Sequence, residues 1–286
     1  MHRRYSGMTL IEVVVALTVT AIIASFSVTL ISAPPATMEA STRRATLGEN
    51  AAQTMMQVER DWRNALPNSL RFRTTAGVLA VEYLAVLDVA VLFRDDIAVP
   101  ANQRLTTGVA DTRFETLGAF SQLTKPVDST AFYVAVHHTG AAGANAWALA
   151  NVITALGTRV QIDAGSSPGQ DQVQLTPATN FTVVGASRRV YILSGPVTYL
   201  CNPVNGTLAR YSDYTIAANQ ALRDTDAELL GAGAARSVLA TGIVNCRIAA
   251  TANATASQTT HHLTVTFRDG TDQLVFDVST VGDNAG

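Results

Sequence analysis

The stretch Gly7-Met8-Thr9-Leu10-Ile11-Glu12-Val13 separates a short basic leader from a long apolar segment. Residues 1–7 are polar and carry two arginines, which should stay on the cytoplasmic side of a membrane. The 24 residues from Leu10 to Ala33 carry a single charge, on Glu12. As a helix they would be about 36 Å long, enough to cross a bilayer with some tilt. Because this segment is apolar on every side, we expect lipid or other helices all around it.

Small residues precede the apolar segment instead of following it. A secretory signal peptide has its small-residue cleavage site after the apolar run, whereas here Ser6-Gly7 stands before it. Cleavage after Gly7 would leave the apolar helix on the mature chain, with Met8 at its new N-terminus. We therefore expect residues 1–7 to be a leader peptide, and residues 8–36 to be the transmembrane and assembly half of an N-terminal helix.

The segment from Gly7 to Val13 resembles the type IV prepilin motif. That motif has a glycine, a hydrophobic residue that becomes the methylated N-terminus, and a glutamate fifth in the mature chain; Met8 stands where phenylalanine is commoner. The resemblance implies cleavage after Gly7 and methylation of Met8 by a prepilin peptidase. It implies storage in the bacterial inner membrane as a single-pass protein with a periplasmic globular domain, and later a place in a pilus at the cell surface. The implied partners are other pilin subunits, the inner-membrane assembly platform, and membrane lipid before assembly.

Glu12 needs a physical reason, because an ionised carboxylate inside a membrane helix costs about 2.5 kcal/mol or more. In a bundle of such helices it would pair with the α-amino group of Met8 on an adjacent subunit and so favour one axial register. The alternative is a carboxylate that the helix dipole stabilises in the first turn. The prepilin resemblance implies the assembly role.

A second half of the helix follows the apolar segment. Pro34-Pro35 predicts a kink or short break, because proline lacks the backbone donor and its ring crowds the preceding turn. Residues 37–67 then predict an amphipathic half-helix whose apolar face packs on a globular domain. That face consists of Leu47, Ala51, Met55, Val58, Trp62 and Leu66. Pro67 and the turn residues Asn68-Ser69 predict its end.

Residues 68–286 change to β-branched and aromatic segments that are separated by turns. We expect strands at Val78–Val91, Ala131–His137, Phe181–Val184, Arg189–Leu193, Val197–Cys201, Leu263–Phe267 and Leu274–Val278, the last two as a hairpin. Asn205-Gly206 predicts another tight hairpin, and the Ala-rich residues 217–235 predict a short helix. The predicted fold class is α+β, with a long N-terminal helix packed on an antiparallel β-sheet domain as in type IV pilins.

Several segments resemble the O-type minor pilins of the mannose-sensitive haemagglutinin (MSHA) pilus. They are Trp62–Arg71, Asp111–Phe114, Phe132–Trp147, Arg189–Cys201 and Gly206–Tyr211. The resemblance covers most of the chain, and its most specific part is Gly195-Pro196-Val197-Thr198-Tyr199-Leu200-Cys201. It implies a minor pilin in the priming or tip complex of an MSHA-like pilus, with roles in pilus assembly and cell adhesion. Two alternatives stay open, a pseudopilin of a type II secretion system and an adhesin module presented on a pilus.

Cys201 and Cys246 are the two cysteines of the chain, which allows one intramolecular pairing and no structural zinc site made of thiols alone. A disulfide is expected if the domain is exported; two reduced, buried cysteines are the alternative. In the MSHA-type family a second cysteine follows as Cys246 does here, which favours the disulfide.

Composition and motifs argue against an enzyme or a nucleic-acid-binding protein. The formal net charge is -2, and no basic stripe occurs along the chain. Neither a nucleophile elbow nor a phosphate-binding glycine loop is present. The doublets His137-His138 and His261-His262 read as strand-end histidines, because adjacent residues on a strand point to opposite faces. Candidate calcium ligands are Asp269, Asp272 and Asp277, or Asp95 and Asp96, but their spacing matches no defined calcium loop. We therefore expect no catalytic residue, cofactor or metal.

Overall fold

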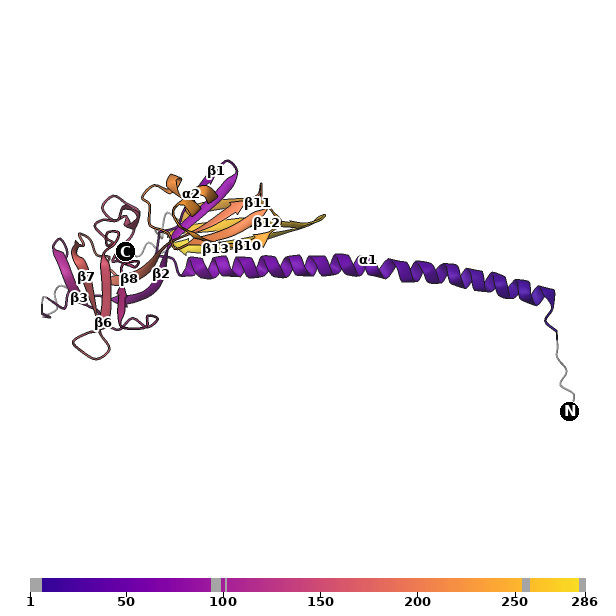
Figure 1. The fold of residues 1–286 in the computed structure, drawn as a ribbon, viewed down its shortest axis with the longest axis horizontal. Helices are drawn as coiled ribbons and strands as arrows, with labels where there is room; N and C mark the ends of the chain where they lie inside the picture. The colour runs from indigo at the N-terminus through magenta and orange to yellow at the C-terminus, as the bar shows by residue number, and fades with distance from the viewer. Residues whose placement is uncertain (1–6, 94–98, 101, 254–257, 283–286) are drawn as a thin grey trace. The chain divides into compact units, whose positions relative to one another are not determined.

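The computed structural model describes the backbone of residues 7–93, 99, 100, 102–253 and 258–282. The chain divides into two units, residues 1–49 and residues 50–286. Helix α1 (Leu10–Arg63) crosses the boundary between them, and the strands lie in the second unit. An N-terminal apolar helix followed by a domain of antiparallel sheets confirms the predicted α+β fold class (Figure 1).

The sequence predicts a kink or a short break at Pro34-Pro35; helix α1 continues through both prolines, so a break is excluded. The two prolines remove the donors that would reach the carbonyls of Leu30 and Ile31, which is a local loss. Long helical stretches on both sides keep their own bonds, and helix propagation is cooperative. The helix ends at Arg63, before Pro67 is reached.

The largest sheet has the strand order β1-β2-β8-β9-β10, and β5 also pairs with β8. Its strands are β1 (Arg71–Thr75), β2 (Val78–Val91), β5 (Tyr133–Ala135), β8 (Arg189–Asn202), β9 (Thr207–Ser212) and β10 (Ala235–Thr241). The prediction for Val78–Val91 is confirmed from end to end, and the turn at Asn205-Gly206 joins β8 to β9 as expected.

Two smaller antiparallel sheets complete the second unit, and Figure 1 shows them on either side of β8 in that view. One has the order β3-β7-β6-β4, made of β3 (Ala110–Glu115), β4 (Val127–Ser129), β6 (Arg159–Ala164) and β7 (Asp171–Asn180). The other has the order β11-β12-β13, made of β11 (Ile243–Asn253), β12 (Gln258–Asp269) and β13 (Asp272–Gly282). The predicted C-terminal hairpin is therefore confirmed, with longer strands than expected.

Strand β8 joins two segments that the sequence predicts separately, Arg189–Leu193 and Val197–Cys201. Its pairing with β2 steps over Ser194, which leaves that residue in a bulge. Gly195 has φ +119°, a conformation that side-chain-bearing residues rarely adopt. Pro196 follows the bulge, where a missing backbone donor is tolerated even inside a central strand.

Three other predictions have mixed outcomes. Of Ala131–His137, residues 133–135 alone form a strand. The prediction of a strand at Phe181–Val184 is wrong; Phe181 is instead fully buried in a core cluster with apolar residues of β3, β6, β7 and β8. The expected short helix exists as α2 (Asp226–Gly231), which Thr225 and Glu228 cap reciprocally in a capping box. The chain also has two short 3₁₀ helices among its described residues, η1 (Ala146–Ala148) between β5 and β6 and η2 (Gln220–Leu222) just before α2.

The last turns of α1 supply a buried stripe to the core of the second unit. Ala51, Met55, Val58 and Trp62 expose 0%, 3%, 0% and 3% of their surface, and Leu66, just after the helix, exposes 1%. Burying a large apolar side chain contributes about 1.5–3 kcal/mol. The predicted apolar face is therefore confirmed as core, and Leu47 is buried as well.

Candidate functional site

The candidate site begins where α1 begins. Residues 7–9 precede the helix, and the carbonyl of Thr9 accepts hydrogen bonds from the N–H groups of Glu12 and Val13, at 3.1 and 3.3 Å. Glu12 therefore sits in the first turn, where the positive end of the helix dipole stabilises its carboxylate. Its side chain is exposed, and it pairs with no cation among the residues that the structure describes.

Gly7 is not required by the fold of the chain itself. A Cβ added at this residue would meet no atom within 4 Å, and its φ lies outside the left-handed region. Any need for glycine at this position must therefore come from another molecule that approaches the backbone.

The apolar part of α1 is uncovered. Residues 10–27 form a span of 18 residues with mean hydropathy 2.2, long and apolar enough to cross a membrane, and none of it is buried. Leu10, Ile11 and Phe26 expose 85%, 73% and 67% of their surface. So large a continuous apolar surface requires lipid or other helices around it.

Hydroxyl groups in this span are satisfied within the helix. Thr18 donates to the carbonyl of Val15 at 2.9 Å, and Ser25 donates to that of Ile22 at 2.8 Å. Such bonds let polar side chains remain in an apolar environment, where water cannot solvate them. Glu12 therefore carries the one charge of residues 10–27, which the helix dipole stabilises but which no described cation pairs with.

In the second unit, Asp61 fastens the end of α1 to the largest sheet. Its Oδ2 accepts hydrogen bonds from the hydroxyls of Tyr83 on β2 and Tyr199 on β8, at 3.0 and 2.8 Å, and from Nε of Arg210 on β9 at 2.8 Å. Burial, and next the negative charge of Asp61, raise the pKa of both tyrosines, so both phenols stay protonated and donate. The sequence analysis did not identify this cluster.

A second buried cluster orders the loops beside β1. Glu82 is fully buried and accepts hydrogen bonds from Nε of Arg71 at 2.7 Å and from the hydroxyl of Tyr214 at 2.9 Å. Burial raises the pKa of Glu82, and the charge of Arg71 opposes that shift. The Arg71 guanidinium also lies 3.5 Å from the centre of the Trp147 ring. This cluster joins β1 and β2 to the segments that carry Trp147 and Tyr214.

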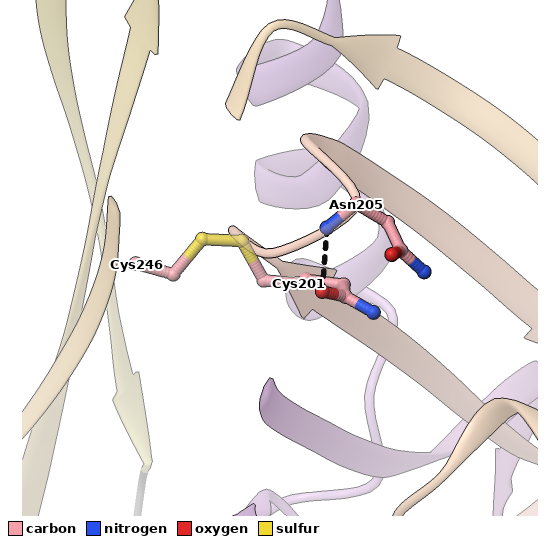
Figure 2. The surroundings of a disulfide bond; sticks show 4 residues. Cys201, Asn205 and Cys246 are labelled. Carbon is pink, nitrogen blue, oxygen red and sulfur yellow. Dashed lines mark hydrogen bonds between the residues drawn. A yellow bond between two sulfur atoms is a disulfide. The ribbon is translucent and has the colours of Figure 1, made fainter. Parts of the chain in front are cut away.

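A disulfide joins Cys201 of β8 to Cys246 of β11, with their Cα atoms 6.3 Å apart. Figure 2 shows the bridge between the two strands, next to the turn where the Asn205 N–H donates to Oδ1 of Asn202 at 3.0 Å. The expected pairing is confirmed, and it links the largest sheet to the three-stranded sheet.

The histidine doublets do not form a metal site. His138 lies in the loop after β5, where its Nδ1 accepts from the Ala146 N–H at 2.9 Å and its Nε2 donates to the carbonyl of Asn68 at 3.1 Å. Burial lowers the pKa of His138 to about 4, so the ring is neutral near pH 7. His261 and His262 lie within β12 and not at its end; His261 is half-buried against Phe72 and His262 is exposed.

Of the aspartates considered as calcium ligands, Asp269 and Asp272 are cross-strand partners, whereas Asp277 pairs with Thr264 further along the hairpin. Asp269 and Asp272 flank the turn of the β12–β13 hairpin, and Asp277 accepts a hydrogen bond from Thr264 at 2.5 Å. Within the described parts of the chain, no three His, Cys, Asp or Glu side chains come close enough to hold a metal ion. Asp95 and Asp96 lie outside the described residues.

Residues 2–28 match the family model of the prokaryotic N-terminal methylation motif. The match supports a type IV pilin-type protein. For a protein of this type, the motif implies processing by a prepilin peptidase and association with other pilin subunits, which are structural roles and not enzymatic ones. The uncovered apolar helix fits membrane anchoring before assembly. Comparison with curated proteins and with solved structures found no match for the chain.

Proposed function

We propose that the chain is a minor pilin of an MSHA-like type IV pilus, cleaved after Gly7 and N-methylated at Met8. The observation that carries this proposal is the methylation motif of residues 2–28 on a helix whose apolar residues 10–27 are uncovered. The resemblance of Gly195–Cys201 to MSHA-type minor pilins supports the finer assignment; this segment lies in β8, the strand that holds the disulfide.

In this proposal each part of the chain has its own task. Residues 1–7 are removed, residues 8–36 lie in the inner membrane and later in the helix bundle of the fibre, and residues 37–67 carry the helix into the globular part. Residues 68–286 are the domain that faces the periplasm and, after assembly, the cell exterior. The subunit enters the priming or tip complex from the inner-membrane assembly platform.

Gly7 and Glu12 act at different steps. The fold of the chain leaves room for a side chain at Gly7, so the glycine serves the peptidase, which must bring its catalytic groups close to this backbone. Glu12 is the exposed charge in an apolar span, and pairing with the freed α-amino group of a neighbouring Met8 removes its desolvation cost in the fibre. That pairing would stabilise one axial register between neighbouring subunits.

Mass spectrometry of purified, sheared surface fibres tests this function. The expected result is a chain in the fibre fraction that begins at N-methylated Met8. A chain that is processed and methylated but remains in the membrane fraction would contradict the pilus assignment and favour the pseudopilin of a type II secretion system. A chain that keeps residues 1–7 in every fraction would contradict both.

A further inference from the structure

A groove of about 380 Å³ lies on the largest sheet, within the second unit. Its lining comes from β2 and β8, from the end of α1 with the residues that follow it, and from the loop that carries Ser121 and Gln122. This volume is within the range of small-molecule sites, toward its lower end. The minor pilin assignment gives this groove no role.

Hydrogen bonds hold the walls of this groove in place, so the groove exists before any ligand arrives. The Val86 N–H donates to the carbonyl of Asn64 at 2.9 Å, which fastens the segment after α1 to β2. The loop is fastened to β2 as well, because Oδ2 of Asp88 accepts from the N–H groups of Gln122 and Leu123, at 2.5 and 3.0 Å. A preformed groove has little ordering cost on binding, which favours affinity.

The lining of the groove is positively charged, and its cationic side chains can be reached from solvent. Arg63 exposes 73% of its side chain, and Arg189 is also exposed. Arg63 shares its charge with Glu59, whereas Arg189 makes no ion pair with any described residue. Asp88 is the one acid among the described residues of the lining; it is 5% exposed, and both of its carboxylate oxygens accept from backbone N–H groups. An anion can therefore approach the guanidinium groups without meeting an exposed carboxylate in the lining.

The rest of the lining combines hydrogen-bonding groups with an apolar surface. Asn64, Ser121 and Gln122 are exposed and offer amide and hydroxyl groups that both donate and accept. Val89 of β2 exposes 44% of its surface, and its cross-strand partner Tyr191 of β8 is half-buried. A ligand that matches this lining has a negative charge, several hydroxyl groups and one apolar face.

Two simpler occupants would use only part of this lining. A small inorganic anion would contact the guanidinium groups and leave the amides and the apolar surface unused. An acidic peptide can gain affinity by adding a strand to a sheet edge, but β2 and β8 are interior strands that pair with each other and with β1, β5 and β9. An acidic sugar has a carboxylate for the arginines, hydroxyl groups for the amides, and ring C–H groups for the apolar surface.

We propose that this groove binds an acidic sugar residue, a hexose ring that carries a carboxylate. The carboxylate pairs with the guanidinium groups of Arg189 and Arg63. The ring hydroxyls exchange hydrogen bonds with Asn64 and Gln122, and the apolar face of the ring lies on Tyr191. This proposal goes beyond pilus assembly and does not depend on it, because every residue that it uses belongs to the second unit of one chain.

The test is a titration of the full, oxidised chain in micelles of a polyoxyethylene detergent, which has neither a charge nor a sugar. The main probe is the methyl glycoside of glucuronic acid. Its matched neutral probe is the methyl glycoside of glucose, which has a hydroxymethyl group in place of the carboxylate. Acetate serves as a carboxylate without a sugar ring. Binding is followed by saturation transfer from protein to probe in proton NMR, with detergent alone as the background.

We expect the glucuronic acid glycoside to bind in a saturable way, and the glucose glycoside and acetate each to bind about tenfold more weakly. Arg189→Gln should weaken binding of the acidic glycoside by about threefold to tenfold, since solvent screens a charge in an open groove. The control Arg159→Gln makes the same change of charge at an exposed arginine of β6, which pairs with Asp128 and does not line the groove. Binding to this control should equal binding to the wild type.

Several outcomes would overturn the proposal. Equal binding of the two glycosides would leave the carboxylate without a role, and equal binding of acetate and the acidic glycoside would leave the sugar ring without one. Equal weakening by Arg189→Gln and Arg159→Gln would mean that the probe responds to net charge and not to this groove. If a peptide of four aspartates bound and the acidic glycoside did not, the occupant would be an acidic protein segment. Absence of saturable binding would overturn the proposal as well.

Discussion

Replacement of Asp61 by alanine should detach the end of α1 from the sheet that it packs on. Three donors share its Oδ2, at 3.0 Å from Tyr83, 2.8 Å from Tyr199 and 2.8 Å from Arg210. A hydrogen bond to a charged group contributes about 1.5–3 kcal/mol. The three do not add in full, because they meet at one oxygen and Arg210 keeps 26% of its side chain exposed. We therefore expect the free energy of unfolding to fall by about 3–5 kcal/mol, the cost of breaking a largely buried pair.

The assay is chemical denaturation of the full, oxidised chain in one detergent, followed by tryptophan fluorescence, since Trp62 adjoins the replaced residue. Asp61→Asn keeps an acceptor oxygen without the charge and should cost less, about 1–3 kcal/mol. The control is Asp163→Ala, whose exposed carboxylate accepts a hydrogen bond from the N–H of Ala164. That control should change stability by about 0.5 kcal/mol or less. If Asp61→Ala is as stable as this control, the three hydrogen bonds to Asp61 do not hold the end of α1 on the sheet, and the reasoning is refuted.

Acidification should destabilise the fold through His138, because burial lowers its pKa to about 4 in the folded chain, whereas an unfolded histidine titrates near about pH 6.5. Between these two pH values only the unfolded chain binds the proton, so the free energy of unfolding is unaffected above about pH 6.5 and falls by up to about 3 kcal/mol toward pH 4. His138→Gln should make the free energy of unfolding less dependent on pH, as denaturation curves at several pH values would show. Replacing Cys201 and Cys246 by serine should cost about 4 kcal/mol by the chain-entropy model, and a reductant should destabilise only the wild type, as denaturation midpoints would show. Glu12→Ala should insert into membranes normally but be depleted from sheared fibres, and wild-type amounts there would contradict its assembly role. Gly7→Trp should leave the leader attached, and an immunoblot band of mature size would count against this prediction.

The parts of the fold that were predictable from sequence are those whose cause is local. Val78–Val91 is a long apolar segment rich in valine and leucine, and it forms one strand. Phe181–Val184 has similar local character, yet Phe181 fills a core between strands that are distant in the sequence, so its conformation depends on tertiary packing. The helix through Pro34-Pro35 is a similar case, because the bonds of many neighbouring turns outweigh the two missing donors.

The residues of the candidate site also differ in whether the sequence alone could predict them. Gly7, Met8 and Glu12 stand close together in sequence, and a motif in one short segment can be read directly. The hydrogen bonds that Asp61 accepts from Tyr83, Tyr199 and Arg210 could not be predicted from the sequence. Arg210 is 149 residues away from Asp61, and each of these residues alone resembles an ordinary surface or strand residue. Trp62 Nε1 is buried, and no described residue accepts a hydrogen bond from it. The sequence could not predict this, because it depends on which residues the folded chain places around the ring.

The bridge between Cys201 and Cys246 has a mechanical consequence. If the chain is pulled from its two ends, the residues between the cysteines stay inside a closed loop, and their sequence separation is 45. At about 3.3–3.6 Å per extended residue, the closed loop makes the fully unfolded, stretched chain about 150 Å shorter than it would be without the disulfide. Tension then passes from β8 to β11 through two sulfur atoms, and β9, α2 and β10, which lie inside the loop, carry none of it once they unfold.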